Sequence, residues 1–251
     1  MKDTKTQIFI AKGFSPWFNG NLGNDYYECM DIWEDSSHVV SVDESVPGQA
    51  TVTCDSDITN MSYMFNLTHL TSLDLSGFDA SNVTSMRSMF EDCRNLTSLD
   101  LSNLNTSNVT TMEWMFSKCC NITSIDLSNI NTSNVTNMGG MFSYCYILTK
   151  LDLSSFDTSK VKDMNGMFYH CSKLTSVDLS NIDTSNVMNM TTMFCNCTNL
   201  TTIKGVIDMK SCTECYCMFK NCPKLKNVKI KNPPANFDAA GLSKSQYTIV
   251  S

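Results

Sequence analysis

Apolar residues recur along most of this chain in a repeat of 25 or 26 residues. A Met-Phe dipeptide marks each copy, and its methionines are Met64, Met89, Met115, Met141, Met167, Met193 and Met218. A fixed period of this length is typical of a solenoid, in which each copy is one coil and stacking buries the apolar faces of neighbouring coils. We therefore predict a solenoid of about seven coils over residues 57–230.

Two apolar groups within each copy predict the path of one coil. In one copy the first group has the spacing L-x-x-L-x-L and consists of Leu96, Leu99 and Leu101. Its last two leucines alternate with polar residues, as in a strand with one buried face. The second group has the closer spacing of a short helical or 3₁₀ turn and consists of Val109, Met112, Met115 and Phe116. We expect a mainly β, leucine-rich-repeat-like solenoid, a right-handed coil stack with a parallel sheet and short helical or 3₁₀ returns.

The two ends of the chain depart from the repeat. Residues 1–56 contain no Met-Phe copy and are rich in aromatic residues between Phe14 and Trp33. Because an end coil exposes an apolar face that a cap must cover, this segment is expected to be an N-terminal cap or an attachment module. Residues 231–251 follow a distorted last copy, and we expect a C-terminal cap or tail there.

Most of the 13 cysteines belong to the repeat. Six of them lie four residues after the methionine of a Met-Phe pair: Cys93, Cys119, Cys145, Cys171, Cys197 and Cys222. This column predicts small, stacked, buried thiols. The close spacing of cysteines near the C-terminus leaves two alternatives open, a zinc site between Cys195 and Cys222 and a disulfide between Cys195 and Cys217.

Aspartates also form a column, on the polar face of the predicted strands. They are Asp74, Asp100, Asp126, Asp152 and Asp178. Neighbouring carboxylates in such a column repel one another, by about 1 kcal/mol per pair in water. We expect a solvated polar ladder, with a bound cation as the alternative.

Charge and composition disfavour several classes of protein. The formal net charge of −7 is opposite to the charge that neutralises phosphates, so no nucleic acid is expected as a partner. No stretch reaches the ~20 apolar residues of a membrane-spanning helix, so no membrane insertion is expected. The three histidines lie in no recognisable nucleophile or metal motif, so we expect no catalysis, no cofactor and no bound metal.

The repeat phrase LTSLDLSNxxTSNVTxMxxMFxxC resembles the BspA-type leucine-rich-repeat surface proteins, in the subgroup whose 25–26-residue repeats carry Met-Phe. The resemblance covers the seven Met-Phe copies. It implies a bacterial surface or adhesion protein that binds host matrix or other cells, with relatives in protists and phages. A non-enzymatic recognition function and an extracellular or cell-surface location are therefore expected.

The residues beside each Met-Phe pair vary between copies, whereas the apolar columns do not. This variation places large amphipathic rings on neighbouring coils: Trp114, Tyr144, Tyr146, Tyr169 and His170. Such rings on a rigid surface are common anchors for ligands. We predict that they form an edge that binds a protein or glycan ligand on another cell or in the matrix.

The start of the sequence supports a second interpretation. The apolar run from Ile8 to Ala11 is too short for a secretory signal, and the sequence shows no anchoring tail. The alternative expectation is a phage virion structural component, such as a decoration, fibre or tail protein, held by its N-terminal segment. Its partners would be virion neighbours or further copies of the chain.

Overall fold

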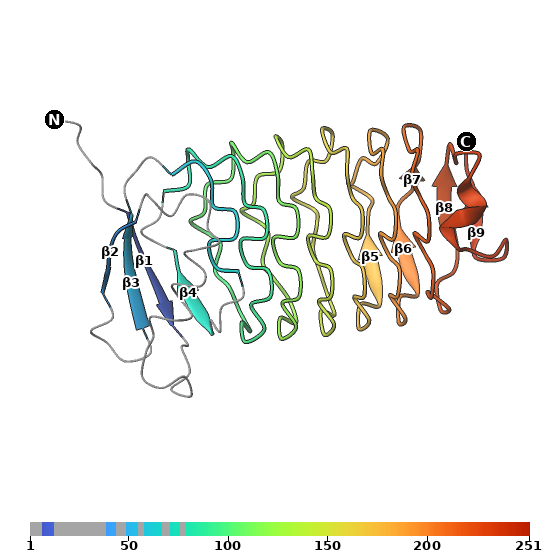
Figure 1. The fold of residues 1–251 in the computed structure, drawn as a ribbon. Helices are drawn as coiled ribbons and strands as arrows, with labels where there is room; N and C mark the ends of the chain where they lie inside the picture. The colour runs from blue at the N-terminus through green and yellow to red at the C-terminus, as the bar shows by residue number, and fades with distance from the viewer. Residues whose placement is uncertain (1–6, 13–38, 44–48, 55–57, 67–70, 76–78) are drawn as a thin grey trace.

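The computed structural model describes residues 7–12, 39–43, 49–54, 58–66, 71–75 and 79–251, which form a row of stacked coils with small sheets at both ends (Figure 1). The strands are β1 (Gln7–Lys12), β2 (Val39–Asp43), β3 (Gln49–Cys54), β4 (Ser72–Asp74), β5 (Ser176–Asp178), β6 (Thr202–Lys204), β7 (Ile207–Asp208), β8 (Val228–Lys231) and β9 (Tyr247–Ile249). A 3₁₀ helix, η2, spans Phe237–Ala240. The aromatic residues between Phe14 and Trp33 lie outside the described residues.

The strands form three small sheets. At the N-terminal end the order is β2-β3-β1-β4, and the pairs within this sheet are antiparallel. Strands β5 and β6 form a parallel pair, and β7, β8 and β9 form a parallel sheet at the C-terminal end. The chain is thus mainly non-helical with short parallel strands, which is consistent with a repeat solenoid.

The predicted continuous parallel sheet is wrong for the middle coils. The leucine group is a strand in β5 and β6, but residues 96–101, 122–127 and 148–153 are not strands. The physical reason is that these coils make most of their mutual backbone hydrogen bonds elsewhere. At the leucine group a bond such as Thr149 N to Thr123 O, at 3.1 Å, joins neighbouring coils. A denser set runs through the Met-Phe segment.

The Met-Phe segment, for which the spacing predicts a short helical or 3₁₀ turn, is a series of tight turns and contains no continuous helix. Within one coil, Met115 N donates to Met112 O at 3.2 Å and Ser117 N donates to Trp114 O at 3.0 Å. The alternate amides bond to the next coil: Trp114 N donates to Gly139 O at 2.8 Å, and Phe116 N to Met141 O at 2.9 Å. A column of single parallel bridges continues this pattern from Asn60 to Glu214. Each coil is therefore fixed to its neighbour along this segment.

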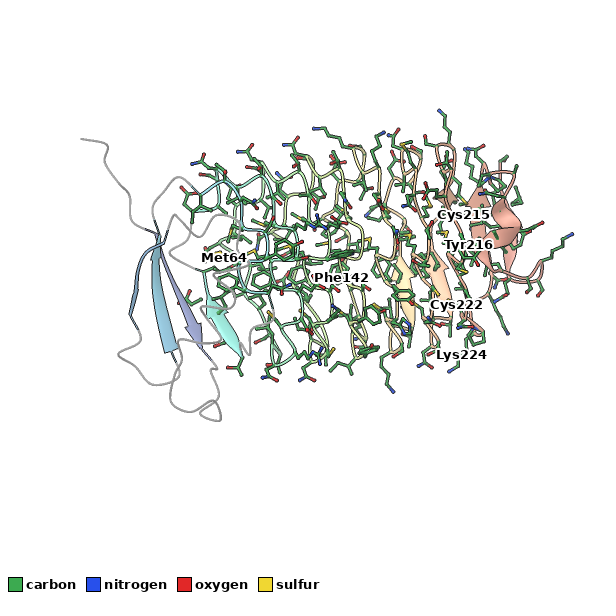
Figure 2. All side chains as sticks on the ribbon, in the orientation of Figure 1. Met64, Phe142, Cys215, Tyr216, Cys222 and Lys224 are labelled. Atoms are coloured by element: carbon green, nitrogen blue, oxygen red, sulfur yellow. The ribbon has the colours of Figure 1, made fainter. Side chains whose placement is uncertain are left out.

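The phenylalanines of the Met-Phe pairs form one continuous ladder through the interior. Their ring centroids are 5.2–5.9 Å apart and their planes lie within 12° of parallel: Phe65, Phe90, Phe116, Phe142, Phe168, Phe194 and Phe219. Figure 2 shows Phe142 inside the stack. The methionine columns beside this ladder are also buried. Offset aromatic stacking contributes about 0.5–1.5 kcal/mol per pair beyond the area that it buries.

The repeated cysteines lie in the core, as their spacing predicts. Each thiol donates to the carbonyl oxygen of a phenylalanine of the preceding coil, at 2.9–3.2 Å. Burial raises the pKa of the Cys145 thiol to about 12 and that of Cys222 to about 12. These side chains therefore stay protonated at neutral pH.

A column of buried threonines also joins the coils. Thr132 Oγ1 donates to Asp157 O at 2.9 Å and accepts from Asp157 N at 2.8 Å. Thr106 makes the same pair of bonds to Asn131, and Thr184 makes it to Asp208. Because one hydroxyl satisfies both backbone groups of the next coil, this column fixes the corner between the two apolar groups.

The thiol column predicts unequal cysteine reactivity. With native protein at pH 8, we expect a maleimide to modify the half-buried Cys217 and to leave Cys145 unmodified, because Cys145 is fully buried and burial keeps its thiol protonated. Peptide mass spectrometry with and without denaturant measures both sites. Equal modification of Cys145 and Cys217 in the native protein would contradict the buried column.

The threonine column predicts a cost for an isosteric substitution. Thr132→Val keeps the shape of the side chain but leaves the amide and the carbonyl of Asp157 without their partner. We expect a loss of about 1–3 kcal/mol in the free energy of unfolding, measured by denaturant titration. Thr132→Ser keeps the hydroxyl and is the matched control, so it should lose clearly less than the valine variant.

Candidate functional site

Two positions in each Met-Phe segment have a left-handed backbone. One precedes the methionine and the other follows it by three residues. The first column has φ between 51° and 64° and contains Tyr63, Ser88, Trp114, Gly140, Gly166, Thr192 and Cys217. The second has φ between 59° and 64° and contains Asp92, Lys118, Tyr144, His170, Asn196 and Asn221. Because this conformation is unfavourable for residues other than glycine, the hydrogen bonds between coils must hold it.

These two columns border a groove on the side of the stack. The groove has a volume of about 420 Å³, within the range of ~300–1,000 Å³ typical of ligand sites. Its lining residues come from five successive coils and are Glu91, Trp114, Ser117, Lys118, Gly140, Ser143, Tyr144, Asn165, Gly166, Tyr169 and Thr192. The groove therefore follows the direction of stacking and crosses several repeats.

Trp114 borders the groove because its neighbour in the next coil is a glycine. A Cβ atom at Gly140 would lie 1.8 Å from Trp114 Cδ1, so the indole occupies the space that a side chain would fill. The guanidinium of Arg87 lies 5.3 Å from the centre of the Trp114 ring, a cation–π contact. The Arg87 Nε atom is also 3.3 Å from Glu113 Oε2. These contacts fix the indole while leaving it 39% exposed.

Three aromatic side chains cluster around Tyr144. Its ring stacks on His170 with centroids 5.0 Å apart, and it meets Tyr169 and Tyr146 edge to face at 5.1 and 5.9 Å. Asn196 Nδ2 lies 2.9 Å from His170 Nε2, and Asn196 Oδ1 accepts from Asn221. The amide therefore donates to a neutral imidazole. Burial lowers the pKa of His170, which also favours the neutral ring.

The charged side chains of the groove pair with each other. Lys118 Nζ lies 3.0 Å from Glu91 Oε1 and donates to it. This hydrogen bond raises the pKa of Lys118. Glu91 Oε2 also accepts from Asn66 Nδ2 at 3.4 Å. The groove consequently contains one positive and one negative group that largely neutralise each other.

Comparison with known protein families identifies the repeat. A family described as "Mycoplasma protein of unknown function, DUF285" matches residues 49–143 and 119–232. The two matches overlap and together span residues 49–232 of the 251. The chain belongs to this family. No curated protein and no solved structure matches the chain.

In this member of the DUF285 family, three of the five predicted site residues line the groove. They are Trp114, Tyr144 and Tyr169. The other two, Tyr146 and His170, do not line it but pack against Tyr144. The sequence therefore predicts that these rings lie near one another, but it does not show which of them face a groove.

Sequence reasoning missed the polar residues of the groove. The groove is also lined by small and charged residues at the same variable positions as the predicted rings, namely Glu91, Ser117, Lys118 and Ser143. The prediction included only large rings. The one available signal was the pair Gly139-Gly140, which interrupts columns of larger residues. A glycine at the position that follows Trp114 in the next coil indicates space for the indole ring.

The aspartate column has local partners in this structure. Asp100, Asp126, Asp152 and Asp178 each accept a hydrogen bond from the amide two residues later, at 2.9–3.0 Å. Hydrogen bonds from the same serines lower the pKa of each carboxylate. Such turns stabilise the charged form, so the ladder is explained without a cation.

The alternatives for the C-terminal cysteines find no support in the described part of the chain. Cys195 and Cys217 are separate thiols. Within the described ranges, no group of three or more His, Cys, Asp or Glu side chains is arranged to hold a metal ion. Among these residues there is also no helix that qualifies as a membrane span.

The contact between Trp114 and Gly140 predicts a difference between two glycine substitutions. Gly140 and Gly166 have nearly the same backbone, with φ of 62° and 59°, so alanine at either costs about 1–2 kcal/mol. Only Gly140→Ala collides with the indole, because the nearest atoms at Gly166 are 3.6 Å away. We expect acrylamide quenching of Trp114 to increase in Gly140→Ala and to stay unchanged in Gly166→Ala.

Both glycine variants are best made in a Trp17→Phe, Trp33→Phe background, in which Trp114 is the remaining tryptophan. Quenching that is the same in the two variants would show that Trp114 does not occupy the space above Gly140.

Proposed function

We propose that this protein is a non-enzymatic recognition module that binds a protein or glycan ligand through the groove between Trp114 and Tyr144. In this proposal the stacked coils form a rigid platform, and the variable residues beside each Met-Phe pair supply the contacts. The proposal includes display at the cell surface, as in the BspA-type leucine-rich-repeat proteins that the repeat resembles.

The observation that carries the proposal is the composition of the groove. Its walls are the rings of Trp114, Tyr144 and Tyr169, which come from three different coils. Trp114 and Tyr144 occupy the two left-handed columns, where other coils carry Ser88, Gly166 or Lys118. Large rings that are partly exposed and already held by neighbours can bind a ligand with a small loss of conformational entropy.

The chemistry of the groove supports binding more than catalysis. Glu91 and Lys118 are paired with each other, so neither is directed as a free acid or base toward a substrate. The imidazole of His170 packs against Tyr144 and accepts from Asn196, outside the residues that line the groove. A recognition surface needs shape, rings and hydrogen-bonding groups, and these are present.

A direct test is binding of the full chain to an array that carries both extracellular-matrix proteins and glycans. We expect Tyr144→Ala, Tyr169→Ala to weaken binding to the recognised ligand at least tenfold, because both rings form the wall of the groove. Tyr216→Ala is the matched control: Tyr216 is 65% exposed and lies near the C-terminal end of the stack (Figure 2). Binding that is equal for the double variant and the wild type would exclude this groove as the site.

A further inference from the structure

We propose that the ligand of the groove is a neutral oligosaccharide that lies along the stack across several coils. This inference rests on the proposed recognition function and specifies the chemical class of its ligand. It depends on four properties of the groove: the kind of apolar surface, two hydroxyls without partners among the described residues, the balance of charge, and the shape.

The apolar surface of the groove consists of rings. The described lining residues include Trp114, Tyr144 and Tyr169 but no Leu, Ile, Val or Met. A groove that accepts apolar peptide side chains typically offers aliphatic surface to them. The face of an aromatic ring instead carries partial negative charge. It therefore attracts the C–H groups of a sugar ring, which neighbouring oxygen atoms make partly positive.

Two serine hydroxyls face the groove without a hydrogen-bond partner among the described residues. Ser117 is 4% exposed and Ser143 is 7% exposed, and both residues line the groove. Their backbone groups belong to the turns of the Met-Phe segment, but no hydrogen bond joins either hydroxyl to another described residue. A hydroxyl that makes no hydrogen bond within the protein and faces the groove can pair with a ligand, so a ligand that supplies hydrogen bonds there gains affinity. A sugar hydroxyl both donates and accepts, as does serine.

The charge balance favours a neutral sugar over a sulfated or phosphorylated one. Lys118, the cation that lines the groove, already donates to Glu91 at 3.0 Å. An anionic ligand would have to compete with this carboxylate and would meet its charge at short range. A hydroxyl group can instead donate to Glu91 while the ion pair stays intact.

The shape of the groove fits an extended ligand. Gly140 and Gly166 follow Trp114 in the first left-handed column, so neither of these two successive coils contributes a side chain there. The indole of Trp114 covers Gly140, so the space without a side chain lies at Gly166, and Tyr169 belongs to the same coil as Gly166. Sugar rings that stack on Trp114 and on the tyrosines would place some of their free hydroxyl groups close to Ser117 and Ser143.

Isothermal titration calorimetry with the full chain tests this inference. The probes are neutral tetrasaccharides of glucose, mannose, galactose and N-acetylglucosamine, together with a heparin-derived tetrasaccharide. We expect at least one neutral probe to bind, and the sulfated probe to bind more weakly. Trp114→Ala should weaken binding about tenfold or more, and Ser117→Ala, Ser143→Ala should weaken it by a similar factor. Tyr216→Ala should have no effect.

The serine variant provides a second route if Trp114→Ala does not fold, because it changes two small side chains and leaves the rings in place. Failure of all neutral probes to bind would overturn the glycan inference, as would tighter binding of the sulfated probe. Neutral-probe binding that neither variant weakens would also overturn it. If unglycosylated matrix proteins bind and Tyr144→Ala, Tyr169→Ala abolishes that binding, the recognition function stands and the glycan inference fails.

Discussion

The hydrogen bonds between the Met-Phe segments of neighbouring coils are the constraint on which the rest of this structure depends. They fix the spacing of the coils, so that the phenylalanine ladder can stack and the thiols can reach the carbonyl oxygens of the preceding coil. They also hold two residues per coil in a left-handed backbone that most side chains disfavour. That conformation places Trp114 and Tyr144 at the border of the groove. The core and the candidate site are thus products of one backbone pattern.

The core was the part of the fold most open to prediction from the sequence. The columns of Phe142 and Cys145 can be read directly, because the first repeats its residue type in all seven copies and the second in six of them. The local conformation of the backbone was less accessible. An interval of three positions between apolar residues fits a helical turn, but it fits a chain of tight turns equally well. The hydrogen bonds that favour tight turns over a helical turn join neighbouring coils. The sequence of a single coil therefore does not reveal them.

The site could be predicted only in part for a related reason. Tyr144, Tyr146, Tyr169 and His170 pack together and Trp114 lines the same groove as Tyr144, since residues at equivalent positions of neighbouring coils lie side by side. Which columns face a common groove depends on where left-handed residues turn the chain, and those positions carry residues as different as Ser88, Trp114 and Thr192. The two serines of the groove, Ser117 and Ser143, could not be singled out from the sequence, because serine is also abundant in the corners of the repeat.

The length of the groove has a mechanical consequence. Coils in a stack of this kind contact their immediate neighbours, so the stack can open one coil at a time, and its cooperativity is short in range. The lining residues extend from Glu91 to Thr192 and belong to five successive coils. A ligand that occupies this length would contact coils that do not touch one another and would link them to each other. Binding of such a ligand would then also hold the middle coils of the stack together.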